Sequence, residues 1–165
     1  MGNTPSRLPA DDLPVERVSW EACREFCKKV GLELPTEAQW EYACRAGNPG
    51  PYGGTDGLDG IGWYRGNSGG TPHPAGRKQA NGFGLRDMHG NVGEWCEDAY
   101  DEGFYSSPRA TEKDPVCTAS SRYRVRRGGS WSVIAAGCRS SYRGRWDPAN
   151  DSSGLGFRPV FSRLP

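Results

Sequence analysis

Two segments in the first third of the chain carry apolar residues at the spacing of an amphipathic helix, with a period of about 3.6. The first segment follows Ser19, a candidate N-cap, and Gly31 stands where that helix would end. Charged residues fill most of the positions between the members of an apolar stripe formed by Trp20, Cys23, Cys27 and Val30. We therefore expect a helix that lies with this stripe on a core.

The second helical segment opens with the sequence of a capping box. Thr36 stands three residues before Gln39, and each side chain can accept a hydrogen bond from a backbone N–H group that the helix leaves free. The helix is expected to end at Gly47. Its apolar positions are Trp40, Ala43 and Cys44.

The hydrophobic pattern then becomes irregular. Residues 48–84 are rich in glycine and proline, which favours loops, and only a short strand near residues 61–64 is expected there. Burial of aromatic rings can offset the entropy lost when so long a loop is ordered. The expected buried anchors are Trp63, Tyr64 and Phe83.

Two later segments have the pattern of strands. In residues 122–126 tyrosine and valine alternate with arginine, which predicts a half-exposed strand that ends at the glycines after Arg127. A final strand is expected over residues 157–161, where Pro159 places it at a sheet edge or a bulge. Two early helices followed by loops and short strands indicate an α+β domain.

The composition limits size, class and partners. A chain of 165 residues is long enough for one domain, and 24 glycines with 13 prolines exclude an extended helical bundle. A net charge of +1 gives no overall field that would attract nucleic acid or an anionic membrane. No apolar run has the length of a membrane span, and the first residues lack the apolar centre of a secretory signal, so we expect a soluble protein in the cytoplasm.

Six cysteines, at positions 23, 27, 44, 96, 117 and 138, leave three alternatives open. Buried reduced thiols are the simplest, because unpaired cysteine is among the most buried residue types. A disulfide and a metal cluster are the others. The cysteines and the two histidines, His73 and His89, do not have the spacing of a Cys2His2 zinc site.

Four blocks occur together in an order and spacing that resemble the formylglycine-generating enzyme superfamily. They are LPTEAQWEYACRAG (34–47), NGFGLRDMHGNVGEWCED (81–98), RVRRGGSW (124–131) and GFR (156–158). The resemblance implies a variant of the C-type lectin fold with two helices, short antiparallel strands and long loops. It predicts a tail over residues 1–14 and a single compact domain over residues 15–165.

The resemblance also bears on catalysis. Formylglycine-generating enzymes use two cysteines, five positions apart, just after their GGS-aromatic motif, and such a thiolate pair suits Cu(I). Counted forward from that motif, the two positions hold Val133 and Cys138. Counted back from the GFR block, they hold Ser130 and Ala135. Neither count completes the pair, so we expect no enzymatic activity and no required cofactor; an atypical enzyme of this type is the alternative.

The C-terminal segment resembles the variable proteins of diversity-generating retroelements more closely. In that group a fixed frame of RGGSW, CRS, an arginine, a proline and GFR encloses diversified positions, and here the frame spans residues 127–158. The resemblance implies that the positions between the frame residues form a ligand-binding surface. Those positions are Ser132, Val133, Ile134, Gly137, Tyr142, Gly144, Arg145, Trp146, Asn150, Ser152, Ser153 and Gly154.

The residues themselves favour the same hypothesis. Residues 132–137 have neither a period of two nor one of 3.6, which is untypical of core. Arg139 and Arg143 are candidate frame residues, because a guanidinium group can bond several backbone carbonyls. Exposed tyrosine, arginine and tryptophan are enriched in protein-binding sites, and the alternative for Trp146 is that it merely packs.

We therefore predict a monomer that binds a macromolecular ligand, with protein as the expected class and without nucleic acid or membrane insertion. An accessory structural module, which would have no selective partner, is a further alternative.

A second candidate site comes from the same resemblance. Asp87, Gly90, Val92 and Glu94 match the pattern with which formylglycine-generating enzymes hold a structural Ca2+, and oxygen ligands on a turn suit a hard cation. The alternative is that the two acids are capping or solvated groups. His89 is expected to be a surface residue of this turn, and the arginines at 122–127 a solvated strand face or a buried frame.

Overall fold

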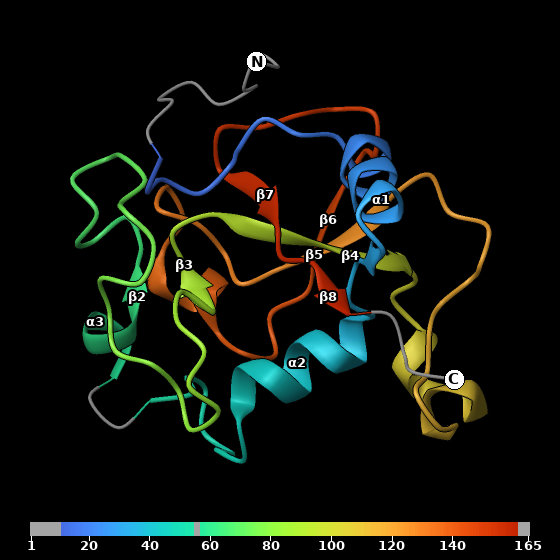
Figure 1. The fold of residues 1–165 in the computed structure, drawn as a ribbon. Coiled ribbons are helices and arrows are strands. Elements are labelled where there is room, and N and C mark those ends of the chain that lie inside the picture. The colour runs from blue at the N-terminus through green and yellow to red at the C-terminus, as the bar shows by residue number, and fades with distance from the viewer. Residues whose placement is uncertain (1–10, 55–56, 162–165) are drawn as a thin grey trace.

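A four-stranded sheet forms the centre of the molecule, with the strand order β6-β5-β4-β7. The computed structural model describes residues 11–54 and 57–161, so most of the predicted tail and the last four residues of the predicted domain lie outside it. The strands of the central sheet are β4 (Gly93–Ala99), β5 (Arg124–Arg127), β6 (Gly144–Trp146) and β7 (Leu155–Phe157). Figure 1 shows this sheet between the two longer helices.

The two helices cover opposite faces of the sheet because neighbouring side chains of a strand alternate between its faces. Trp95 packs with Trp20, Cys23 and Cys27 of α1 (Trp20–Lys29). The next residue, Cys96, packs with Trp40 and Cys44 of α2 (Glu37–Arg45). We call these two sides of the sheet the α1 face and the α2 face.

Helix α1 begins as predicted, since the Ser19 side chain accepts a hydrogen bond from the Ala22 N–H at 3.1 Å. The prediction that Val30 belongs to the buried stripe is wrong. Val30 is the C-cap and is 51% exposed, because the helix ends at Lys29 and the chain turns away at Gly31, where φ is +72°.

The predicted capping box opens α2. Thr36 Oγ1 accepts from the Gln39 N–H at 3.2 Å, and Gln39 Oε1 accepts from the Thr36 N–H at 2.9 Å. The helix ends at Arg45, and its C-cap, Ala46, has left-handed backbone angles one residue before the predicted stop at Gly47. Glu37, in the first turn, is completely buried, and this position becomes important for the site described below.

The rest of the domain is made of short elements joined by loops. The long loop contains a helix that the sequence did not predict, α3 (Gly57–Ile61), and β2 (Gly62–Trp63), which confirms the predicted short strand. β2 pairs with β3 (His89–Gly90), and β1 (Leu32–Glu33) pairs with β8 (Val160–Phe161). Three 3-10 helices complete the description: η1 (Phe104–Ser106), η2 (Pro108–Thr111) and η3 (Ala135–Cys138).

The α+β fold class is confirmed, and three details differ from expectation. Two strand pairs, β4 with β7 and β2 with β3, are parallel, because β7 and β3 reach their partners by crossover connections. The predicted final strand is divided into β7 and β8 around Pro159, which has no N–H to donate. The Phe83 ring is 50% exposed and packs on Tyr42, so it is not a buried anchor.

All six cysteines are buried, and none forms a disulfide in the structure, in agreement with the first of the three alternatives. Within the part of the chain that the structure describes, no helix has the length and apolar character needed to cross a membrane.

Candidate ligand-binding surface

A cavity of about 390 Å³ lies beside η3 and β6. Its lining comes from several separate segments of the chain, and five of the predicted variable positions belong to it. The lining residues are Arg65, Arg126, Gly129, Val133, Ile134, Ala136, Gly137, Tyr142 and Gly144. We call this space the variable-segment cavity.

The main chain around the cavity is fixed by hydrogen bonds to distant parts of the fold. The Arg65 N–H donates to the Val133 carbonyl at 2.9 Å, and the Tyr52 hydroxyl donates to the Ala135 carbonyl at 3.1 Å. The Ser140 N–H donates to the Pro51 carbonyl at 2.8 Å. These bonds use backbone groups of the variable segment, so they do not depend on which side chains stand there.

Gly129 shows why the frame needs glycine at the start of this segment. Its φ is +75°, and a Cβ at this position would lie 2.6 Å from Cys138 Sγ and 2.7 Å from the Gly137 carbonyl oxygen. A side chain would therefore push η3 away from β5.

A buried network of arginines and carboxylates supports the cavity from the α2 face. Arg127 donates to Glu37 at 2.8 Å and to Glu41 at 2.5 Å, and it also donates to the Ser140 carbonyl. Arg143 bonds both carboxylate oxygens of Glu37 at 2.8 Å and the Asp101 carbonyl at 2.9 Å. Arg143 thus acts as the predicted frame residue, whereas the side chain of Arg139 is exposed.

On the α1 face, Arg126 forms part of the cavity wall. Gly144 lies opposite it on β6, and a Cβ at Gly144 would lie only 2.8 Å from Arg126 Cγ. The guanidinium lies over the Trp146 ring, 5.5 Å from its centroid. Ile134 is 57% exposed, Tyr142 42% and Trp146 39%, so these side chains face solvent around the cavity.

The other predicted variable positions lie outside the cavity. Ser132 is exposed, and its hydroxyl lies 3.1 Å from that of Ser130. The carbonyls of Ser153 and Gly154 accept bonds from the Trp131 indole and the Gly93 N–H, which fixes this segment beside β4. Two more positions of that segment, the half-buried Ser152 and the exposed Asn150, are not among the cavity's lining residues.

Arg145 lies on the opposite side of the sheet from Trp146, because the two are consecutive residues of β6. Its guanidinium lies 5.3 Å from the ring centroids of both Tyr100 and Tyr123. The structure therefore does not bring Arg145 together with Tyr142 and Trp146 on one surface.

Sequence reasoning missed three lining residues, Arg65, Ala136 and Arg126. For Arg126 a signal was present, since it alternates with the buried Val125 and precedes the frame directly. For Arg65 there was none, because its place depends on a contact with residues almost seventy positions later.

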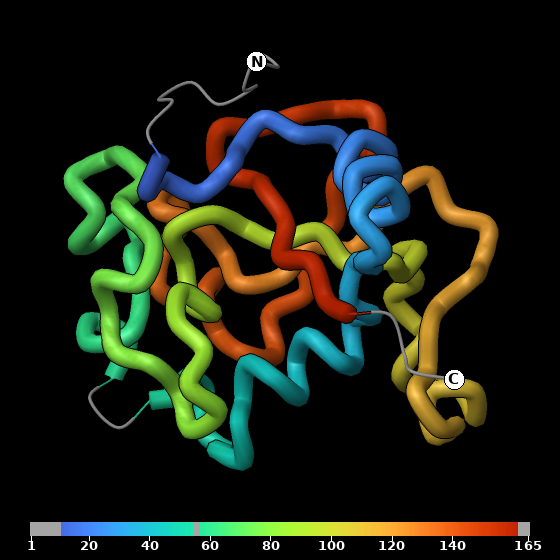
Figure 2. The backbone as a smooth tube through the Cα atoms, in the orientation of Figure 1, coloured from blue at the N-terminus to red at the C-terminus, as the bar shows by residue number. Residues whose placement is uncertain are grey.

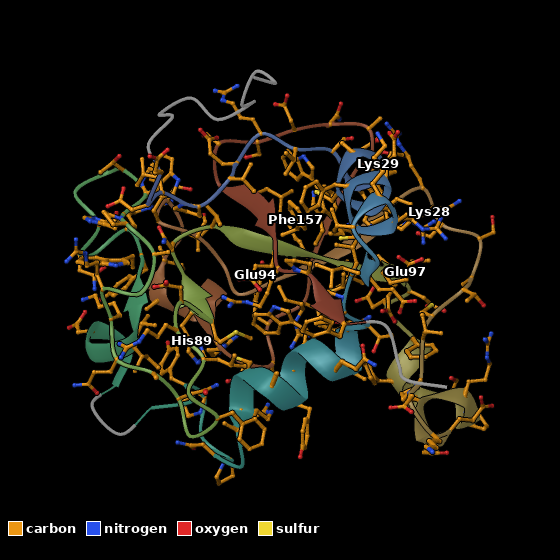
Figure 3. The ribbon with its side chains drawn as sticks, viewed as in Figure 1. Lys28, Lys29, His89, Glu94, Glu97 and Phe157 are labelled. Atoms are coloured by element: carbon orange, nitrogen blue, oxygen red, sulfur yellow. The ribbon has the colours of Figure 1, made fainter. Side chains whose placement is uncertain are left out.

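The two acids of the predicted calcium site have different surroundings. Asp87 Oδ1 is buried and has no hydrogen-bond partner, while Oδ2 accepts from the Gly76 N–H at 2.6 Å. Glu94, labelled in Figure 3 near the middle of the molecule, accepts from Trp40 at 2.7 Å and from Arg158 at 2.8 Å. Glu94 is therefore already paired with a cation, whereas the unpartnered oxygen of Asp87 could accept a ligand. The calcium site with the Gly90 and Val92 carbonyls stays a prediction.

His89 is not the surface residue that we expected. Its side chain is buried against Tyr52, with Nδ1 2.8 Å from the Cys138 carbonyl and Nε2 accepting from the Gly53 N–H at 2.9 Å. Burial lowers the pKa of His89, and this bonding pattern requires the neutral ring with its proton on Nδ1. His89 therefore ties β3 to η3.

The two positions counted for the catalytic cysteine pair do not fit a soft metal. Val133 contributes hydrocarbon to the cavity, and burial raises the pKa of the Cys138 thiol to about 11. A buried neutral thiol beside a valine offers no thiolate pair.

With this geometry established, we compared the chain with known proteins. Residues 2–163 match the model of the sulfatase-modifying factor enzyme 1-like domain. The chain belongs to this family. A formylglycine-generating enzyme of Streptomyces coelicolor is 35% identical over 88% of this chain, and that of Mus musculus is 32% identical over 99%. The family match agrees with the four sequence blocks.

The chain spans only part of the curated relatives that it matches. It covers 51% of the Streptomyces enzyme and 48% of the mouse enzyme. A serine/threonine-protein kinase pkn1 of Chlamydia caviae is 37% identical over 88% of this chain, which corresponds to 23% of that protein. The domain therefore occurs within longer proteins of different names.

Solved structures confirm the fold and the second resemblance. Treponema denticola variable protein 1 superposes with a TM-score of 0.82 at 30% identity, over 96% of this chain and 77% of that one. PvdO from Pseudomonas aeruginosa has the same TM-score at 24% identity, over 92% of this chain and 63% of that one, and supports the fold alone. The chain is thus a family member that resembles variable proteins of diversity-generating retroelements.

Proposed function

We propose that the chain binds a protein ligand through the surface around the variable-segment cavity. The observation that carries this proposal is the convergence of Val133, Ile134, Gly137, Tyr142 and Gly144 on one cavity, although they belong to separate segments. Hydrogen bonds from Arg65 and Tyr52 hold the backbone at Val133 and Ala135, so substitutions of the exposed side chains of this surface would change the surface more than the stability. Gly144 is an exception, because an added Cβ would lie 2.8 Å from Arg126 Cγ. Tyrosine and tryptophan at its edge are residue types that dominate protein interfaces.

We also infer that this surface acts by binding and performs no covalent reaction. Cys138 is buried as a neutral thiol, and hydrocarbon stands at the partner position. Purified protein incubated with Cu(I), oxygen and a cysteine-containing peptide should leave the peptide unchanged in its mass spectrum. Conversion of the cysteine to formylglycine would refute this inference and favour the enzyme alternative.

A pair of display libraries tests the binding proposal. The first randomises Val133, Ile134, Tyr142 and Trp146. The matched control randomises four exposed apolar residues elsewhere: Phe26, Val30, Tyr42 and Phe83. Both libraries are selected against the same panel of unrelated folded proteins, such as hen lysozyme, after a protease step that removes unfolded variants.

The first library should yield at least about ten times more variants with micromolar or tighter affinity than the control. Its members should also survive the protease step as often as those of the control. Equal yields, or loss of most first-library variants to protease, would contradict the proposal.

A further inference from the structure

Three arginines of β5 differ in what satisfies their charge. Arg124 donates to the Glu97 carbonyl at 3.2 Å and lies over the Trp20 ring, and Arg127 is paired with two carboxylates. Arg126 has no hydrogen bond or ion pair with any residue that the structure describes. Its Nε–H is buried without an acceptor, as is that of Arg127, so the two arginines differ in the carboxylates that Arg127 has and Arg126 lacks.

Arg126 is half-buried, and its buried Nε–H is costly, because it gives up water and gains no acceptor. Burial lowers the pKa of Arg126, which is the direction expected for a cation that lacks compensation. The Trp146 ring offers a cation–π contact, yet it supplies no acceptor for the N–H groups. An anion bound in the cavity would supply the negative charge and the hydrogen-bond acceptor that Arg126 lacks.

The lining of the cavity limits which anion fits. No acidic residue lines it, so nothing there repels a negative group. Val133, Ile134 and Ala136 present hydrocarbon, and the second cation, Arg65, already donates its Nε–H to the Ser132 carbonyl at 3.0 Å. Arg65 is exposed, so solvent can screen its charge, whereas Arg126 is half-buried beside the apolar wall. The cavity therefore favours a negative charge attached to an apolar group.

We propose that the variable-segment cavity binds an aspartate or glutamate side chain of the partner protein together with an adjacent apolar side chain. The carboxylate pairs with the planar guanidinium of Arg126, and the apolar group packs on Val133 and Ile134. This proposal rests on the proposed function and adds the chemistry of the residues that the partner presents. Arg126 precedes the predicted variable region, so the cation would stay while the surrounding side chains differ.

Three small probes test the charge selectivity: 3-phenylpropanoate, its neutral amide 3-phenylpropanamide, and phenyl phosphate. Binding is followed through the methyl resonances of Val133 and Ile134 in 13C-labelled protein. The carboxylate should shift these resonances with millimolar affinity, as a fragment does, and should bind at least about tenfold more tightly than the amide.

Arg126→Gln should remove this preference without loss of the fold, since the Arg126 side chain makes no hydrogen bond. Arg77→Gln, at an exposed position outside the cavity, is the matched control and should behave as the native protein. Retention of the preference in Arg126→Gln would overturn the assignment of this guanidinium.

Other outcomes separate this inference from the proposed function. Equal shifts with the amide would show an apolar cavity without charge selectivity, which refutes the inference and leaves the proposed function standing. Tighter binding of phenyl phosphate would also refute it, in favour of a phosphorylated occupant. If no probe shifts these methyl groups, the inference fails, and the display libraries still decide the proposed function independently.

Discussion

Arg126 and Arg127 are neighbours in β5, yet their guanidinium groups lie in opposite environments. Arg127 is buried on the α2 face, and Glu37 and Glu41 both accept its hydrogen bonds. Arg126 lies on the α1 face, beside Trp146 and without a carboxylate. Carboxylates of the fold compensate the charge of Arg127, whereas no residue that the structure describes pairs with Arg126, whose charge is the one that we propose a ligand compensates.

Removal of the Glu37 carboxylate, which Arg127 and Arg143 share, should cause the largest loss of stability. Glu37→Ala would leave Arg127 without an ion pair at its Nη1 and Arg143 without its bidentate partner, both within the protein. We expect the free energy of unfolding, measured in urea, to fall by about 3 to 5 kcal/mol. Arg126→Gln should cost less than about 1 kcal/mol. Equal losses in the two variants would contradict the comparison.

The second prediction concerns pH and Asp98, a residue of β4 whose side chain bonds the first residue of α2. It accepts hydrogen bonds from the Glu37 and Cys117 N–H groups at 2.7 and 2.8 Å. Burial nevertheless raises the pKa of Asp98 from 3.8 to about 6. Between these pH values Asp98 is protonated in the folded protein but ionised in the unfolded chain. The free energy of unfolding therefore contains a stabilising contribution from this proton at low pH, and that contribution is lost as the pH rises through 6.

Comparison with Asp98→Asn isolates that contribution. The difference in unfolding free energy, native minus variant, should decrease by at most about 3 kcal/mol between pH 4 and pH 7. An increase over this range would mean that the two N–H donors outweigh burial.

Gly144→Val should destabilise the wall of the variable-segment cavity by steric strain. The added Cβ would lie 2.8 Å from Arg126 Cγ and 3.1 Å from the Arg126 carbonyl, so either the side chain or the strand has to move. We expect a loss of about 1 to 3 kcal/mol in urea unfolding. Gly137→Ala is the milder control, because its Cβ meets only Val133 atoms, the nearest at 3.3 Å. A larger loss of unfolding free energy in Gly137→Ala would show that the Arg126 side chain moves aside for the added valine side chain without strain.

The smallest expected effect is that of calcium. At 1 mM Ca2+ and a dissociation constant of 0.1 to 1 mM, about the range of weak protein sites, binding would stabilise the fold by about 0.4 to 1.4 kcal/mol. Asp87→Ala should abolish this gain in thermal unfolding, and Asp59→Ala, at an exposed acid outside the site, should keep it. No stabilisation of the native protein by Ca2+ would refute the site.

Local signals in the sequence were sufficient for the two longer helices, but not for β4, the longest strand of the central sheet. The caps at Ser19 and Thr36 act within three residues, so they could be recognised without tertiary information. The blocks around residues 81–98 and 124–131 identified the family and its fold class, but not the order of the strands in the central sheet or its parallel pair. Val30 and Phe83 were wrongly predicted as buried, because a periodic pattern does not show where a helix turns away or which ring remains at the surface.

The candidate site was predictable only in part. The sequence marked Val133, Ile134 and Tyr142, but it could not show that Glu37 bonds an arginine 90 positions later. The separation of Arg145 from Trp146 follows from strand alternation and would have been predictable had β6 been recognised. The missing partner of Arg126 depends on the whole surrounding fold, so no local pattern could have revealed it.

Because β7 follows the predicted variable positions in the chain, the domain can fold only if the coding sequence stays in frame through them. This strand follows the variable segment in the chain and, as the red segment of Figure 2 shows, runs through the middle of the molecule, where Leu155 is buried beside Trp95. A premature stop codon or a frameshift between residues 132 and 154 would remove Leu155 and the partner strand of β4. Such chains would fail to fold, so truncated variants would not present the surface around the variable-segment cavity.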